Sequence, residues 1–216
     1  MPSYKGCLCW VLLLVLPSCA SRLEAHKMKH EIEKLKSVRV QIEGDDGFSV
    51  KKSRTQMSPI GPMFGLIGAG IEAAARASTD SGLADRYADH LKNFHAKEVL
   101  KKHLQYQLTQ VNRAAEDVSA PSDNADGVLI VDLDEWGLRP CQSGKNDDSM
   151  RVFVKAEGKL DTLPGESTLW SKQVTHTEHE CHLLEKYHDE SGLLTDSLSR
   201  SMEALADKIV NQVLYP

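Results

Sequence analysis

The chain has few aromatic side chains, no strong excess of charge and no apolar run long enough for a membrane span at its start. Aromatic residues make up 6% of the 216 residues, which leaves little material for broad surfaces that stack on bases or sugars. The formal net charge is −5, from 26 basic and 31 acidic side chains, and this argues against a protein that coats nucleic acid. We therefore expect no nucleic acid among its partners.

The sequence also lacks the common motifs of enzymes. It has no HExxH, no paired CxxC, no GxSxG elbow and no P-loop, so it carries no signature of a metalloprotease, a serine hydrolase or a nucleotide-binding enzyme. Its hydrophobic fraction of 41% and its length, once a leader is set aside, are sufficient for one domain with a real core. We expect a single folded domain that is not an enzyme and holds no cofactor.

The N-terminal residues have the features of an export signal. Lys5 precedes the apolar run of residues 6–16, which is shorter than the roughly 20 residues of a spanning helix but suits a secretory leader. Leu16-Pro17-Ser18-Cys19 then resembles a bacterial lipobox, in which Cys19 becomes the lipidated mature N-terminus. The alternative is cleavage after Ala20 with plain secretion, because residues 18–20 fit the small-x-small rule.

The lipobox resemblance implies an organisation and a location for the chain. It divides the chain into a signal peptide at residues 1–18, a membrane tether at residues 19–37 and a single domain at residues 38–216. Palmitate and a diacylglyceryl group on Cys19 would hold the protein at the membrane, since one acyl chain alone holds only marginally. Ala20 is not the Asp that retains such proteins at an inner membrane, so an outer-membrane lipoprotein facing the periplasm is implied. A secreted or soluble periplasmic protein is the alternative.

Two cysteines, Cys141 and Cys181, remain once the leader and Cys19 are set aside. In the oxidising cell envelope these two residues can form a disulfide. Two unpaired thiols in separate loops are the alternative, because the sequence does not supply the Cα separation that a disulfide needs. Both interpretations stay open at the level of sequence.

Alternating and apolar segments predict several strands. Residues 38–42 alternate between apolar and polar side chains, and a turn signal at 44–47 indicates that residues 48–52 pair back with them. Residues 128–133 are the clearest buried strand, because their apolar run is continuous before it turns to alternation. Two further strands, at 150–160 and 167–175, form a hairpin around residues 163–166.

Helical periodicity appears in two regions. Residues 81–116 repeat apolar side chains at helical spacing, and the register slips near residues 93–96, where we expect a break. A final helix begins with Thr195 or Asp196 as its cap. The apolar stripe of this final helix comprises Leu198, Met202, Leu205, Ile209 and Val213. The fold class is therefore α/β (α+β): a single small antiparallel or mixed sheet with flanking helices, after the leader.

Small residues recur every fourth position in the Gly/Ala-rich segment at residues 61–77. Such a stripe lets another backbone approach closely, as in pairs of helices with small-xxx-small motifs. The stripe has three interpretations: it packs within the fold, it forms a surface for a partner or a membrane, or it belongs to a short spanning helix. The positions of the stripe are Gly61, Gly65, Ala69, Ala73 and Ala77.

Two polar clusters are candidates for chemistry. The segment with His176, His179, Cys181 and His182 offers imidazole and thiolate ligands for zinc or copper, although its spacing matches no recognised metal site. We expect no metal there and treat the segment as a polar loop. Paired carboxylates at the end of the buried strand can serve acid–base catalysis, but strand alternation places Asp132 and Asp134 on one outward, solvated face. Trp136 and Trp170 are expected in the core or at its rim.

The second half of the chain resembles a group of bacterial envelope lipoproteins. The strand at residues 126–136 is followed by residues 151–160, then by the Gly-Glu…Leu-Trp segment at 164–174 and a closing amphipathic helix. This order is similar to the small domain of lipoproteins related to the ABC-transport auxiliary and curli-secretion groups, in which such a hairpin lies beside a helix after a lipidated leader. The resemblance covers residues 126–214 together with the Cys19 leader.

The resemblance implies a function by binding and carries over no catalytic residue. It implies a membrane-anchored accessory in envelope transport or assembly, which contacts an envelope protein complex or copies of itself. The alternative is a secreted or periplasmic metal-binding protein or metal-dependent enzyme that uses the residues from His176 to His188. The sequence names neither the partner nor the oligomeric state.

Overall fold

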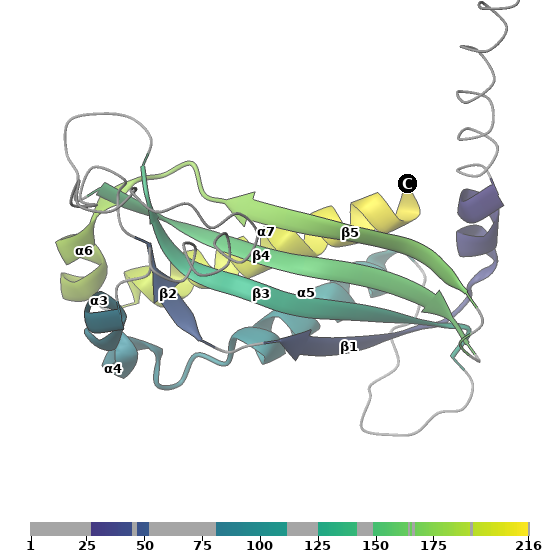
Figure 1. Ribbon diagram of the computed structural model, residues 1–216, viewed down its shortest axis with the longest axis horizontal. Coiled ribbons are helices and arrows are strands. Elements are labelled where there is room, and N and C mark those ends of the chain that lie inside the picture. The colour runs from purple at the N-terminus through teal and green to yellow at the C-terminus, as the bar shows by residue number, and fades with distance from the viewer. Residues whose placement is uncertain are drawn as a thin grey trace, which may run out of the picture.

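The computed structural model describes residues 27–44, 47–51, 81–111, 125–141, 149–163, 165, 167–190 and 192–215. Within these residues the strands form one six-stranded mixed sheet (Figure 1). Its main path has the order β1-β3-β4-β5, while β2 pairs with β3 and β6 pairs with β4. The fold class predicted from the sequence, a single mixed sheet with flanking helices, is confirmed.

The two N-terminal strands do not pair with each other. β1 (Val38–Gly44) and β2 (Phe48–Val50) both run parallel to β3 and occupy successive parts of it. The predicted hairpin between residues 38–42 and 48–52 is therefore wrong. β1 and β2 run in the same direction because both pair with the longer strand β3. This pairing buries Val40 of β1 and Val50 of β2.

Three long strands form the centre of the sheet. β3 (Gly127–Pro140) pairs antiparallel with β4 (Ser149–Thr162), and β4 pairs antiparallel with β5 (Thr168–Thr177). The predicted hairpin at residues 150–160 and 167–175 is confirmed, and the strand predicted at 128–133 extends to residue 140. β6 (His182–Leu183) adds two residues to the start of β4.

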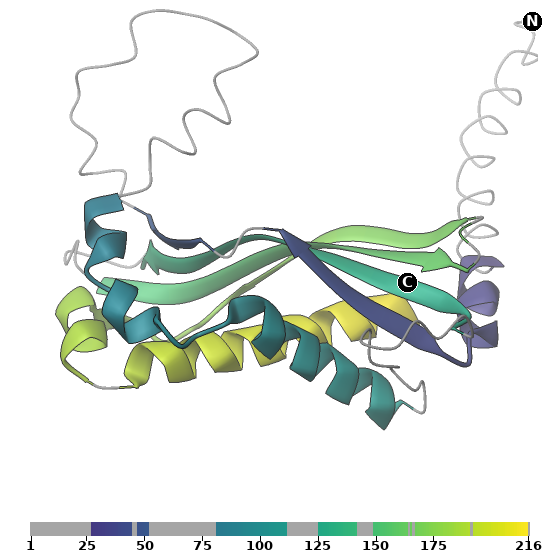
Figure 2. The same cartoon turned by 90° about the horizontal axis from the view of Figure 1, so that it is seen from below.

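Two long helices cover one face of the sheet. α5 (Ala96–Gln110) and α7 (Leu193–Leu214) lie side by side under the strands, as Figure 2 shows. The predicted apolar stripe of the final helix is buried along its whole length. The predicted cap at Thr195 or Asp196 is wrong, because the helix begins at Leu193 after Gly192, whose φ of 93° favours glycine. Thr195 instead donates a hydrogen bond from its hydroxyl to the Gly192 carbonyl at 2.9 Å.

The predicted break in the first helical region is present. α3 (Ser81–Asp85), α4 (Ala88–Leu91) and α5 are separate helices, and residues 92–95 link α4 to α5 without continuing the helix. α6 (Leu184–Asp189) lies beside α3 and α4 at one end of the sheet in both Figures 1 and 2. The short helix of residues 27–34 lies at the opposite end in the same two views. The domain therefore has two distinct ends along its strands.

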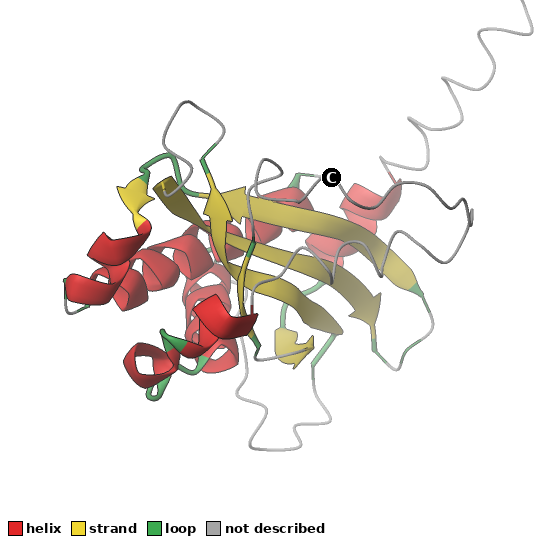
Figure 3. Ribbon diagram, turned by 60° about the vertical axis from the view of Figure 1, so that its left-hand side comes forward, coloured by secondary structure: helices red, strands yellow, loops and turns green. Residues whose placement is uncertain are grey.

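The core lies between the sheet and its helices (Figure 3), and it includes residues before β1. Ile32 and Leu35 are buried with the strand and helix side chains, so the folded unit includes the helix of residues 27–34. Trp136 and Trp170 also belong to this core, as predicted. In the part of the chain that the structure describes, the helices are all too short or too polar to cross a membrane.

The sheet has two faces of opposite character. We call the face under α5 and α7 the inner face, and its strand residues are almost entirely apolar and buried. The other face, which we call the outer face, carries mainly charged and polar side chains. Its residues include Arg39, Gln41, Glu43, Ser49, Lys51, Asp132, Asp134, Glu135, Arg139, Arg151, Phe153, Lys155, Glu157, Lys159 and Asp161.

Candidate functional site

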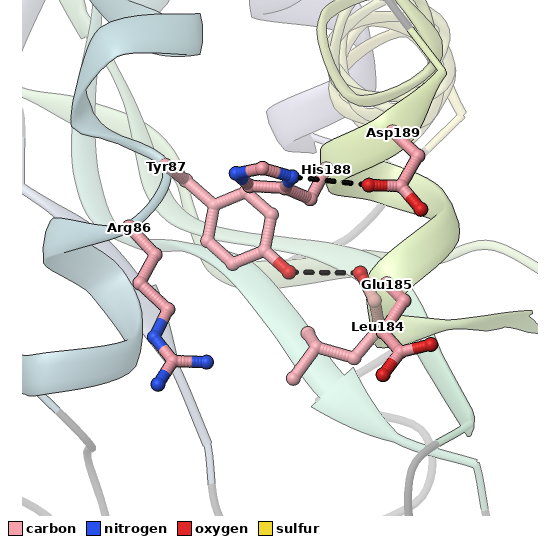
Figure 4. Close-up of a pocket in the computed structure, with 6 residues that line it drawn as sticks. All are labelled: Arg86, Tyr87, Leu184, Glu185, His188 and Asp189. Carbon is pink, nitrogen blue, oxygen red and sulfur yellow. Dashed lines mark hydrogen bonds and ion pairs between the residues drawn. The ribbon is translucent and has the colours of Figure 1, made fainter.

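A cleft opens at the end of the sheet where α3, α4 and α6 meet. It encloses about 350 Å³ and is lined by six side chains, which Figure 4 shows as sticks. Two come from the link between α3 and α4, and four come from α6. They are Arg86, Tyr87, Leu184, Glu185, His188 and Asp189. Segments about one hundred residues apart in the sequence thus form one recess.

Tyr87 forms the inner wall of this cleft. Its ring lies 6.3 Å from the His188 ring and 6.0 Å from the Phe48 ring, centroid to centroid. Its hydroxyl donates a hydrogen bond of 2.8 Å to the carbonyl oxygen of Leu184 (Figure 4). This bond ties the link between α3 and α4 to the start of α6, so the same residue shapes the cleft and holds its two sides together.

The rings around Tyr87 continue as a small aromatic cluster. His90 of α4 lies 5.1 Å from His188 of α6 and 6.4 Å from the Tyr87 ring. Nδ1 of His188 lies 3.2 Å from a carboxylate oxygen of Asp189. The rim of the cleft therefore combines one guanidinium, from Arg86, with two carboxylates, from Glu185 and Asp189.

The phenol of Tyr87 is a fixed hydrogen-bond donor within the cleft. Burial raises the pKa of Tyr87 to about 12, so its phenol stays protonated at neutral pH and remains a donor to Leu184. Among the six described lining residues there is no serine, threonine or cysteine. An aromatic wall with charges of both signs at its rim is suited to a polar segment of another molecule.

Two groups of predicted site residues lie outside the described residues. Cys19, the predicted lipidation site, is one of them, and the small-residue stripe from Gly61 to Ala77 is the other. Both remain predictions from the sequence.

The two mature cysteines are joined in the structure. Cys141, just after β3, and Cys181, just before β6, form a disulfide with their Cα atoms 6.3 Å apart. The bond closes a stretch of 40 residues and links the end of β3 to the segment that leads into α6. It lies at the same end of the sheet as the cleft.

The histidine segment does not assemble a metal site among the described residues. His176 is on β5, half-buried, and its pKa is lowered by burial and then by the charge of Lys208. His182 is on β6 and stacks on Tyr187 with 5.4 Å between ring centroids, while Cys181 is bonded to Cys141. Nowhere in the described ranges do three His, Cys, Asp or Glu side chains come together as metal ligands do. The metal-dependent alternative therefore finds no ligand set in this part of the chain.

The same segment includes a half-buried acidic side chain. Glu178 follows β5, and Nε of Arg200 on α7 lies 3.6 Å from its carboxylate. Burial raises the pKa of Glu178, against the opposing effect of Arg200. Tyr187 is completely buried nearby, and burial, followed by the charge of Glu178, raises the pKa of its phenol. Glu178 and Tyr187 lie against α7 and are part of the packing of α6 on the domain.

The carboxylates at the end of the predicted buried strand are outward and paired, as the sequence indicates for a solvated face. A carboxylate oxygen of Asp134 lies 3.1 Å from Nζ of Lys155 and accepts a hydrogen bond from the Gln173 amide. Glu135 pairs with Lys51 at 2.7 Å. Asp132 lies on the same outer face and is exposed. None of these three carboxylates lines the cleft described above.

Sequence reasoning missed the cleft itself. Tyr87 falls within residues 81–116, whose apolar stripe predicts helices, and His188 only closes the histidine segment that begins at His176. The sequence has no local signal that joins positions 87 and 188, because their contact depends on how α6 folds back on the first helices. A tyrosine within an apolar stripe was the one available hint, since a buried hydroxyl usually has a hydrogen-bond partner.

Comparison with known proteins gives similarity of shape alone. No family model matches the chain, and no curated protein matches its sequence. A Xanthomonas campestris protein of the family DUF330 has a TM-score of 0.48 at 8% identity, over 83% of this chain and 84% of its own. A minor lipoprotein of Acinetobacter baumannii has a TM-score of 0.37 at 14% identity, over 54% of this chain and 84% of its own. A lipoprotein of Neisseria meningitidis has a TM-score of 0.33 at 15% identity, over 57% of this chain and 90% of its own. At these values the similarities assign neither a family nor a function.

Proposed function

We propose that this protein is a lipid-anchored domain of the bacterial envelope that acts by binding a partner protein. The observation that carries the proposal is the placement of the two ends of the domain. The helix of residues 27–34 follows the lipobox-like leader and lies at one end of the sheet, whereas the cleft between α4 and α6 lies at the other. A chain anchored through Cys19 would therefore present its cleft away from the membrane.

The length of the proposed tether supports this arrangement. Residues 20–26 lie between Cys19 and the first described helix, and a fully extended chain of that length spans at most about 25 Å. An anchored domain would thus stay close to the membrane surface while its far end reaches outward. We further propose that the anchored domain is an accessory of transport or assembly at the outer membrane.

The disulfide supports an extracytoplasmic location. Disulfides persist in oxidising compartments such as the periplasm and are rare in the reducing cytosol. The bond between Cys141 and Cys181 holds the segment that leads into α6, which supplies most of the cleft. Export of the chain would therefore be a condition for a properly formed cleft.

The anchor is tested by fractionation of bacteria that express the full chain. We expect the mature wild-type protein in the detergent-extracted membrane fraction. Mature Cys19→Ala protein should be missing from that fraction. Cys9→Ala is the matched control, because it removes a cysteine from the same leader outside the lipobox. Identical processing and fractionation of Cys19→Ala and the wild type would overturn the proposed anchor.

The binding role is tested by site-specific photocrosslinking in the same cells. Glu185 is exposed at the rim of the cleft, and a crosslinker at this position should give one discrete product with a single protein. The product should disappear in the Cys19→Ala background. A crosslinker at Lys159, exposed on the outer face, is the control and should not give this product. The same products from both positions, or none from position 185, would contradict binding through the cleft.

A further inference from the structure

Two arginines face each other on the outer face. Arg139 of β3 lies directly opposite Arg151 of β4 in the antiparallel register, and their buried neighbours Leu138 and Val152 point to the inner face. Side chains that oppose each other in this way have Cβ atoms about 5 Å apart, and like charges at such positions repel. The pair therefore costs the fold free energy unless an anion offsets it.

The outer-face lysines around this pair have carboxylate partners. Lys51 pairs with Glu135 at 2.7 Å, Lys155 with Asp134 at 3.1 Å and Lys159 with Asp161 at 2.7 Å. Among the described residues, neither Arg139 nor Arg151 forms such an ion pair. Within the described residues the pair thus carries two positive charges and no ion-paired carboxylate.

The hydrogen-bonding capacity of the two guanidinium groups is also largely unused within the described residues. Arg139 donates from Nη1 to the hydroxyl of Thr177 at 3.4 Å, a long bond. Nε of Arg151 is buried and has no acceptor. A buried donor without an acceptor is costly. Both arginines are half-buried, and among the described residues their remaining guanidinium N–H groups have no acceptor besides Thr177.

An aromatic ring holds Arg139 in place. Phe153 points to the outer face, yet it is only 2% exposed. The guanidinium of Arg139 lies 5.5 Å from the centre of this ring, and Nζ of Lys51 lies 5.0 Å from it. These cation–π contacts order the Arg139 side chain before any ligand arrives, and an ordered donor loses less entropy on binding.

We propose that Arg139 and Arg151 form a binding site for a phosphate group. Guanidinium groups match phosphate with paired N–H donors. A phosphate monoester carries about −1.5 to −2 charge at pH 7, which complements two neighbouring arginines better than one carboxylate does. The Thr177 hydroxyl lies beside the pair and supplies a further polar contact. The phosphate is either a free ion or esterified to a larger solute, since both present the same terminal oxygens.

The site is independent of the proposed anchor. It lies on the described part of the domain, near the end where Cys141 and Cys181 are joined, so it exists whether or not Cys19 is acylated. It is also separate from the cleft, because none of its residues lines that recess. A failure of one proposal therefore leaves the other standing.

The test is calorimetric titration of the full chain in non-ionic detergent with inorganic phosphate and, separately, with glycerol 3-phosphate. We expect binding that weakens about tenfold or more in Arg139→Gln and in Arg151→Gln, since each variant removes a charge-assisted hydrogen-bonding group. Arg151→Lys, which keeps the charge and loses the paired donors, should fall between the wild type and Arg151→Gln. Lys159→Gln removes one positive charge elsewhere on the same face and is the control.

The two ligands separate the two sources of phosphate. Glycerol 3-phosphate bound at least as tightly as the free ion supports a site for an esterified phosphate, whereas preference for inorganic phosphate supports a site for the free ion. Absence of binding by both ligands, or an equal loss in Lys159→Gln, would overturn the proposal. Thermal unfolding with and without phosphate gives a second readout: the midpoint should rise in the wild type and stay constant in Arg139→Gln, which remains folded because repulsion is relieved.

Discussion

The two faces of β3 differ in both burial and charge. On the inner face Leu129, Val131 and Leu133 are completely buried under α5 and α7. On the outer face Asp132 and Asp134, which alternate with them, are exposed. The same strand thus supplies the core and a charged surface, because successive side chains point to opposite sides.

This difference separates stability from recognition. Apolar burial on the inner face is proportional to the area removed from water and accounts for the fold. The ion pairs of the outer face are partly exposed, and such pairs contribute little to stability. Charges on that face are therefore free to change with a ligand, whereas the inner face tolerates little change.

The sharpest test of the comparison uses two neighbours on β3. Leu133→Ala should lower the free energy of unfolding by about 2–5 kcal/mol, because it removes fully buried methyl groups and leaves a cavity. Asp132→Ala on the exposed side should change it by at most about 0.5 kcal/mol. Urea denaturation of both variants checks this. Similar losses in the two variants would contradict the distinction between the faces.

The disulfide should give the next largest effect, at the end of β3 that carries the cleft. Reduction of the bond between Cys141 and Cys181 should lower the stability by about 2–4 kcal/mol, because it releases a loop of 40 residues in the unfolded chain. Thermal unfolding with and without a reductant measures the loss. A Cys141→Ser/Cys181→Ser double variant is the control, and the reductant should not change its unfolding temperature. A change in that variant would show that the reductant does not act through this disulfide.

A smaller effect is expected at Tyr87, where the cleft meets the core. Tyr87→Phe should cost about 1 kcal/mol, because it removes the hydrogen bond to the Leu184 carbonyl. The pKa of Tyr87 is raised from 10.0 to about 12 in the folded protein, so its contribution is present below pH 10 and is lost as the pH rises through 12. Unfolding measured from neutral to alkaline pH should show a shallower decline in Tyr87→Phe. The same decline in both proteins would contradict the assignment.

The smallest effect is expected from an ion pair of the outer face. Glu135→Gln should lower the stability by about 1 kcal/mol or less, since both partners of the pair with Lys51 are partly exposed. The loss should shrink further at high salt, because screening weakens exposed pairs. Denaturation at low and high ionic strength checks the value. A loss as large as that of Leu133→Ala would show that the outer face holds the fold together after all.

Much of the fold could be predicted from periodicity. The stripe from Leu198 to Val213 predicts the long helix α7, and the apolar residues 128–131 predict the central strand β3. These segments are predictable because their burial is local to one element and its repeat. The direction in which residues 48–50 pair could not be predicted, since Phe48 lies opposite Trp136, and a partner so distant in the chain leaves no local pattern.

The cleft and the arginine pair were beyond the reach of sequence reasoning for a related reason. Arg139 and Arg151 face each other only in the register that pairs residue 140 with residue 150, and a shift of one residue would move one of them to the inner face. Tyr87 and His188 meet only because α6 returns to the first helices after the disulfide. Sites built from distant segments depend on tertiary packing, which the local pattern does not contain.

The intact mass of the mature protein purified from bacterial membranes tests the central claim most directly. An anchored envelope domain predicts a chain that begins at Cys19, with the added mass of its acyl groups and the loss of two hydrogen atoms in the bond between Cys141 and Cys181. A mature chain that begins at Ser21 without acyl mass would contradict the account. The protein would then be a secreted domain, and its cleft would no longer be held at a membrane.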